Sequence, residues 1–157
     1  MNIRSALVVL LVVALASVSL GFIKKTGSGW FTDWDTGNEI KFSVTAQTLE
    51  PLPEEPPYWV LAKGNFQLFD KTEKTSIHGH IDTYYYVPPD PEWSDWEGEC
   101  SVDGTDGYYF LLMLHDEDEP GWPGEWAWIL IYENQTHTLY RQYWLDREKG
   151  DIKNHED

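Results

Sequence analysis

The chain has 157 residues and a formal net charge of −16, because 27 acidic residues outweigh 11 basic ones. Such a charge excludes nucleic acid as a partner, since phosphates require a basic surface. A single cysteine excludes an intrachain disulfide, so stability must come from bound metal or from packing, to which a 15% content of Phe, Trp and Tyr contributes.

The first 25 residues have the pattern of a secretory signal. Arg4 precedes an apolar run from Ala6 to Ala16, and small or apolar residues follow up to Gly21. A charged start, a short apolar core and small residues at a cleavage site are typical of exported proteins. Cleavage after Ala16 or after Gly21 fits this pattern. Counted as far as Ile23, the run approaches the length of a spanning helix, so an uncleaved N-terminal membrane anchor is the alternative.

We therefore expect a secreted or cell-surface protein that meets a membrane only through an uncleaved N-terminal segment. Residues 26–157 are expected to form a single acidic, aromatic-rich domain, which is long enough to bury a core.

Short alternating segments separated by Gly, Pro and Asp follow the signal, and they are typical of β-strands. In residues 40–46, for example, Phe42, Val44 and Ala46 share one face. The pattern predicts an all-β fold, an antiparallel β-sandwich or barrel-like sandwich of about eight strands, preceded by the signal helix. The expected strands are 40–46, 59–62 with 65–69, 76–86, 95–102, 108–115, 126–133, 138–145 and 151–155.

Proline marks two expected surface connections, residues 51–57 and 87–91, because it ends strands and keeps edges from pairing. The expected strands 108–115 and 126–133 are apolar on both faces, which predicts central strands that are covered on both sides. Trp126 and Trp128 are two residues apart, so we expect them to share one covered face.

Four short motifs occur in a characteristic order: KGNFQLFD at 63–70, SIHG at 76–79, FLLMLHDEDEPG at 110–121 and GDIKNH at 150–155. This order resembles the post-COAP domain family of secreted and surface proteins of archaea and bacteria. Asp118 stands where the family usually has Gly, and Asp151 where it has Asn. The resemblance covers most of the chain after the signal, and it implies a β-rich extracellular domain without catalytic activity.

The candidate metal site is the acidic segment expected between the two apolar strands. Asp116, Asp118 and Glu119 precede Gly121, and Ca²⁺ takes six to eight oxygen ligands on a loop that can bend. The alternating acidic spacing of a known calcium loop is missing, so a solvated hairpin loop is the alternative. No cofactor is expected to be required, and Ca²⁺ is the one candidate.

A second cluster, His78, His80 and Asp82, lies on one face of an expected strand. Because Ile77 and Ile81 make the other face apolar, the histidine face is expected to meet solvent rather than a metal. Cys100 lies in a strand-like setting and is expected to be a buried, inert thiol.

Aromatic rings supply the candidate ligand contacts. Trp93, Trp96 and Trp122 lie in or beside loops among acidic residues. Exposed rings next to carboxylates can hold neutral sugars, because a ring stacks on the apolar sugar face and carboxylates accept from its hydroxyls. The alternative is an aromatic-rich core whose rings are half-buried at its rim.

No nucleophile elbow, zinc-protease motif or phosphate loop occurs in the sequence, so no enzymatic activity is expected. The sequence favours a non-catalytic secreted or surface-tethered β-domain that acts in extracellular interaction or envelope structure. The alternative is a small carbohydrate-binding module that uses exposed tryptophans. The expected partner is accordingly an extracellular protein or a neutral glycan.

Overall fold

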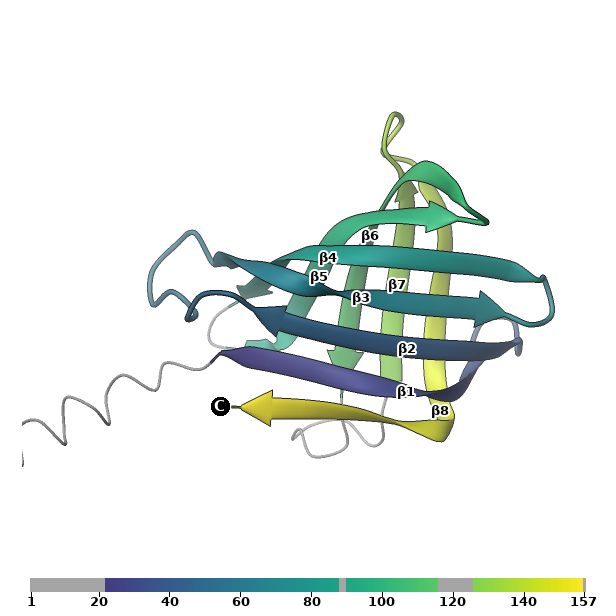
Figure 1. Ribbon diagram of the computed structural model, residues 1–157, viewed down its shortest axis with the longest axis horizontal. Helices are drawn as coiled ribbons and strands as arrows, with labels where there is room; N and C mark the ends of the chain where they lie inside the picture. The colour runs from purple at the N-terminus through teal and green to yellow at the C-terminus, as the bar shows by residue number, and fades with distance from the viewer. Residues whose placement is uncertain (1–21, 88–89, 116–125, 157) are drawn as a thin grey trace, which may run out of the picture.

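The computed structural model describes residues 22–87, 90–115 and 126–156, which form a closed antiparallel β-barrel. Each strand pairs with the next along the chain, and the last pairs with the first. In Figure 1, β1–β4 run across the front, and β6, β7 and the first part of β8 run behind them at a steep angle. The predicted all-β antiparallel fold of about eight strands is therefore confirmed. The strands are β1 (Ile23–Asp33), β2 (Glu39–Thr48), β3 (Trp59–Asp70), β4 (Thr75–Val87), β5 (Asp90–Val102), β6 (Thr105–His115), β7 (Trp126–Glu133) and β8 (Leu139–Glu156).

The longest strand, β8, closes the barrel. Its first part pairs with β7 as far as Asp146, and its second part, from Leu145 onward, pairs with β1. The sequence predicted two strands here because the charged residues around 147–150 interrupt the alternation. That division is wrong, since backbone pairing to β1 continues through this stretch, with an irregularity opposite Trp30 and Phe31.

Strand β1 was not predicted, because its sequence has no apolar alternation. It begins at Ile23, so the folded domain starts inside the segment 1–25 that the sequence assigns to the signal. The Ile23 N–H donates to Thr48 Oγ1 at 3.0 Å. Gly27 and Gly29 pair with Val44 and Phe42. Glycine has no apolar side chain, so at these two positions the sequence lacks the apolar residues from which an inward-facing side of a strand is predicted.

Two further boundaries differ from the prediction. Residues 59–62 and 65–69 belong to one strand, β3, whose pairing with β4 shifts register between Leu61 and Gly64. The expected connection 87–91 is shorter than predicted, since β5 already begins at Asp90. The expected connection 51–57 does lie outside the strands.

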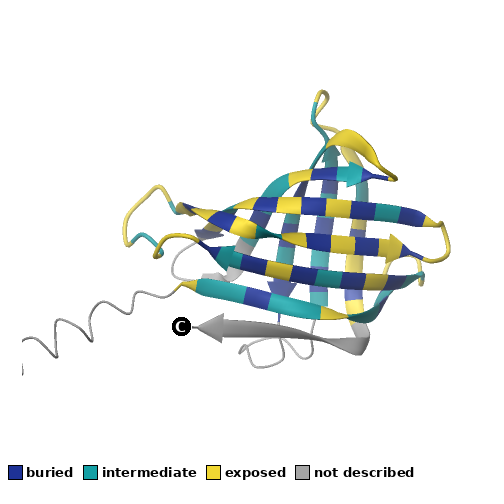
Figure 2. Cartoon of the chain, in the orientation of Figure 1, coloured by how far each residue is buried: buried dark blue, intermediate teal, exposed yellow. Residues whose placement is uncertain are grey.

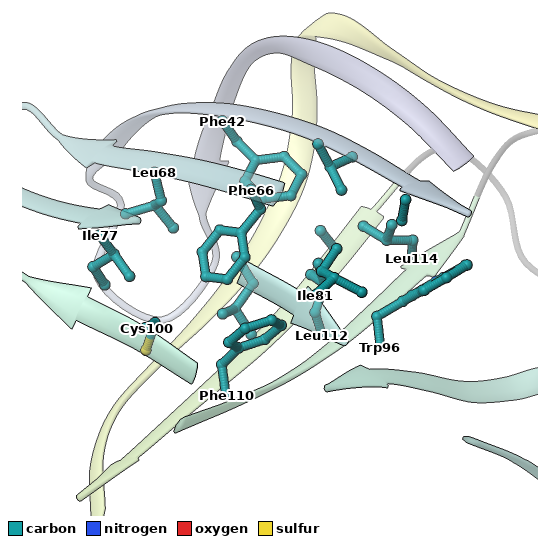
Figure 3. Close-up of a cluster of buried hydrophobic side chains, with 14 of the residues drawn as sticks. Phe42, Phe66, Leu68, Ile77, Ile81, Trp96, Cys100, Phe110, Leu112 and Leu114 are labelled. Carbon is teal, nitrogen blue, oxygen red and sulfur yellow. The ribbon is translucent and has the colours of Figure 1, made fainter. Parts of the chain in front are cut away.

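Alternate residues point into the barrel and fill it, which gives the banded burial along β2, β3 and β4 in Figure 2. Phe66 contacts Phe42 and Phe110 at centroid distances of 6.2 and 4.6 Å (Figure 3). A Cβ added to Gly79 would lie 2.0 Å from Phe66 Cε1, so the ring requires glycine at that position. The interior is therefore a packed core. Its largest buried side chains are Trp96, Tyr84, Tyr143, Phe31, Phe42, Phe66, Phe110, Ile40, Leu68, Ile77, Ile81 and Leu112.

One end of the barrel carries the hairpin turns after β1, β3, β5 and β7, and two buried carboxylates tie the first two turns. Asp70 Oδ1 accepts from the backbone N–H groups of Thr72 and Glu73 at 2.9 and 3.0 Å, and its Oδ2 accepts from Asn38 Nδ2 at 2.9 Å. Asp33 accepts from the Trp144 N–H at 3.0 Å. The Asp70 bonds join the turns after β1 and β3, and the Asp33 bond ties the end of β1 to β8.

Candidate functional site

The outer surface of β6 and β7 is continuously apolar from Tyr109 to Met113 and from Trp126 to Tyr132, and Trp144 of β8 extends it. On β3 and β4, exposed apolar side chains such as Trp59, Leu61 and Tyr85 stand among polar ones. Along β6 and β7 the inward residues are buried and the outward ones are half-buried. We call this surface the aromatic face. It consists of Tyr109, Leu111, Met113, Trp126, Trp128, Leu130, Tyr132 and Trp144.

Strand register brings these side chains into rows across the barrel. Met113 pairs with Trp128, which pairs with Trp144, and in the next row Leu111 pairs with Leu130. The prediction that Trp126 and Trp128 share a face is confirmed. That face lies on the outside of the barrel, and both rings are half-buried there rather than covered as expected.

The rings of the aromatic face pack against one another. Tyr109 and Tyr132 stack at a centroid distance of 5.0 Å and an interplanar angle of 12°. Trp128 and Trp144 stack at 5.6 Å and 28°. At these centroid distances and angles the rings form offset stacks in which each ring covers part of its neighbour's face, so they do not present one flat platform. The arrangement therefore favours contact with apolar side chains over stacking on sugar rings.

At the end of β6, the His115 side chain packs against the edge of the aromatic face. Its ring stacks on Trp126 at a centroid distance of 5.4 Å and an interplanar angle of 14°, and the side chain is buried. Trp126 therefore has a ring packed against it on this side. The stacking fixes its orientation at the edge of the aromatic face.

Strand β5 borders the aromatic face with acidic residues. We call Asp95, Glu97 and Glu99, which alternate along β5 on its outer side, the acidic margin. Glu97 pairs with Leu111 and Glu99 with Tyr109, so the margin is contiguous with the apolar rows. Partial burial raises the pKa of Asp95, and burial followed by repulsion from Asp95 and Asp82 raises the pKa of Glu97. Asp95 and Glu97 therefore repel each other, and a cation would relieve that repulsion.

The residues predicted to contact a ligand do not form one site. Trp96 is 1% exposed and lies in the core (Figure 3). Its ring packs on that of Tyr84 at a centroid distance of 4.5 Å, so its predicted role as a surface contact is wrong. Trp96 is four residues from Cys100 on β5, so both side chains point to the inward side of the strand, and Trp96 is buried there. Trp93 belongs to β5, but its side chain lies outside the described part. Trp122 also lies outside the described residues.

The candidate calcium ligands Asp116, Asp118 and Glu119 lie outside the described residues too, so this site stays a prediction. Within the described part, no group of three or more His, Cys, Asp and Glu side chains is placed to hold a metal ion. His78 and His80 are exposed on the outer side of β4, which confirms the prediction that their face meets solvent.

Sequence reasoning missed the role of Trp144, Tyr109 and Tyr132 in the aromatic face. A signal was present, because both 108–114 and 126–132 are continuously apolar. The sequence could not show that the second face of these strands lies on the outside of a barrel.

The fold and this surface define the chain as a closed eight-stranded antiparallel barrel with an apolar outer face on β6 and β7. No family model, curated protein or solved structure matches the chain, so the resemblance to the post-COAP family stays a prediction. Among the residues described, no helix has the length and apolar character needed to cross a membrane.

Proposed function

We propose that the protein is a non-catalytic secreted or surface-tethered domain that binds an extracellular protein partner through the aromatic face. The observation that carries this proposal is the half-exposed apolar surface of β6, β7 and β8. Extended apolar patches on an otherwise polar surface mark interaction sites, and aromatic residues and Met are enriched in the cores of interfaces.

The acidic margin supports a partner with basic residues beside its own apolar surface. Asp95, Glu97 and Glu99 lie next to the apolar rows, and the chain as a whole carries a charge of −16. A field of this sign speeds encounter with a basic partner and opposes encounter with an acidic one. Binding is therefore expected to weaken as salt is added.

The burial of three reactive side chains, Cys100, Asp33 and Asp70, supports the non-catalytic part of the proposal. The single thiol, Cys100, lies in the core, and burial raises its pKa to about 12. The buried carboxylates Asp33 and Asp70 accept hydrogen bonds from the hairpin turns. These groups stabilise the fold and are not presented to a substrate.

Site-specific photocrosslinking in the native host tests the proposal. A photoreactive phenylalanine derivative replaces Leu111 or Leu130 on the aromatic face, and Lys63, which is exposed on the outer side of β3, serves as the matched control position. We expect the two aromatic-face positions to give the same adduct with one other protein, and the control position to give none.

Two results would overturn this proposal. One is the absence of any adduct from both aromatic-face positions while the variants keep the circular dichroism of the parent chain. The other is an adduct of twice the mass of the chain, which would assign the face to a second copy.

A further inference from the structure

The opposite outer surface, formed by β1–β3, contains a hollow of about 540 Å³. Its lining side chains are small hydroxyls and amides: Thr26, Ser28, Ser43, Thr45, Asn65 and Gln67. All are uncharged, and each can donate and accept hydrogen bonds.

Two further hollows continue this one across the sheet. One of about 330 Å³ shares Ser43 and Gln67 with it, and one of about 380 Å³ shares Asn65. Both reach His78 on β4. We call the first two hollows, which share Ser43 and Gln67, the polar groove; the third lies beside them and reaches β5 and β6.

The register of the strands orders the groove. Ser43 pairs with Gln67, which pairs with His78, so one row of polar side chains crosses three strands. Within the part of the chain that the structure describes, the side chains of Ser43 and Gln67 make no hydrogen bond to protein. Their donors and acceptors are therefore available to a ligand.

The electrostatic setting of the groove is unusual for this chain. Only four of the 27 acidic residues, Asp33, Glu39, Asp70 and Asp82, lie on β1–β4. Asp33 and Asp70 are buried, and Glu39 is paired with Lys71 at 2.7 Å. The groove thus presents neutral hydrogen-bonding groups and Lys41, and the acidic side chains Glu99 and Asp106 line only the third hollow beside it.

Aromatic side chains border one end of the groove. Lys41 pairs with Trp30 on one side and with Phe69 on the other, so the three residues form the next row of the sheet. Phe69 is 38% exposed, and Trp30 is half-buried. Phe69 offers an apolar surface next to the polar row, which suits a ligand that has both hydroxyls and an apolar ring face.

We propose that the polar groove binds a neutral glycan, whose hydroxyls bond to the amides and hydroxyls of β1–β3 and whose ring packs on Phe69. This glycan site lies on different strands from the aromatic face. It is independent of the protein partner proposed for that face, and it differs from the tryptophan site that the sequence suggested.

Affinity gel electrophoresis of the full chain in gels containing dextran, galactomannan or hydroxyethyl cellulose tests this assignment, with alginate as the anionic polymer. We expect at least one neutral polymer to retard the chain with a Kd below about 1 mM, without dependence on salt. Alginate is expected to bind less, because its charge has the same sign as that of the protein.

Variants in the groove and on the aromatic face locate the site. Gln67→Ala removes free hydrogen-bonding groups and is expected to weaken binding about tenfold. Ser43→Trp fills the hollow and is expected to abolish retardation. Trp128→Ala lies on the aromatic face and is expected to bind as the parent does. Unfolding temperatures show which variants keep the fold.

Failure of every neutral polymer to retard the chain would overturn the proposal. So would unchanged binding in a folded Ser43→Trp variant, or loss of binding in a folded Trp128→Ala variant. If Ser43→Trp does not fold, unchanged binding in Gln67→Ala is the overturning result.

Discussion

Asp70 illustrates at the residue scale how a buried charge can serve the fold. Its carboxylate accepts from Thr72, Glu73 and Asn38, so it links two hairpin turns. Asp70→Ala leaves these donors without their acceptor, and we expect the free energy of unfolding to fall by about 1–3 kcal/mol. Urea unfolding measures this loss.

The matched control for Asp70 is Asp35→Ala, which alters an exposed carboxylate on the same rim. Its expected effect is within about 0.5 kcal/mol, as for most surface substitutions. Equal losses in the two variants would contradict a structural role for Asp70.

The buried thiol of Cys100 is expected to make the free energy of unfolding fall at alkaline pH. Burial raises the pKa of its thiol from 9.0 to about 12. Because the folded-state value lies above the unfolded one, the stability gained from the neutral thiol is present below about pH 9. It is lost as the pH rises from there toward 12. We expect the free energy of unfolding to fall between about pH 8 and about pH 10, and to fall less in Cys100→Ala. Identical slopes in urea titrations of the two proteins would show that the thiol does not contribute.

At the scale of the element, β8 decides whether the sheet closes. Its second part pairs with β1 along the whole length of that strand. A chain that ends at Asp146 leaves the backbone N–H and C=O groups along one edge of β1 unpaired, which favours aggregation. We expect this truncated chain to lose cooperative thermal unfolding, as followed by circular dichroism. A chain that ends at Glu156 keeps all of the pairing and is expected to unfold as the parent does. Cooperative unfolding of the shorter chain would show that the barrel does not depend on closure.

At the scale of the whole molecule, net charge opposes the compact state. The charge of −16 creates self-repulsion that added salt screens. We expect the unfolding temperature to rise between about 0.01 M and about 0.5 M NaCl, where the screening length shortens several-fold. Differential scanning calorimetry measures the change. A flat response would mean that the charges are spaced widely enough over the barrel to repel one another little.

The sequence by itself determined the strand character of most segments and the direction of many side chains. Phe42, Val44 and Ala46 are buried as their alternation predicts, and His78 and His80 are exposed. These predictions succeed because the two-residue period of a strand is a local property that survives in any sheet. The burial of Cys100 was predictable on similar grounds.

Only the tertiary structure decided which surfaces those strands make. Closure depends on the pairing of β1 with β8, which lie at opposite ends of the chain, and on backbone hydrogen bonds that glycine and lysine form as readily as apolar residues do. The same closure leaves the second apolar face of β6 and β7 on the outside and buries Trp96. It also joins polar side chains of β1, β2 and β3 into one groove. Neighbours that are distant in the sequence make these surfaces, and a local pattern carries no information about them.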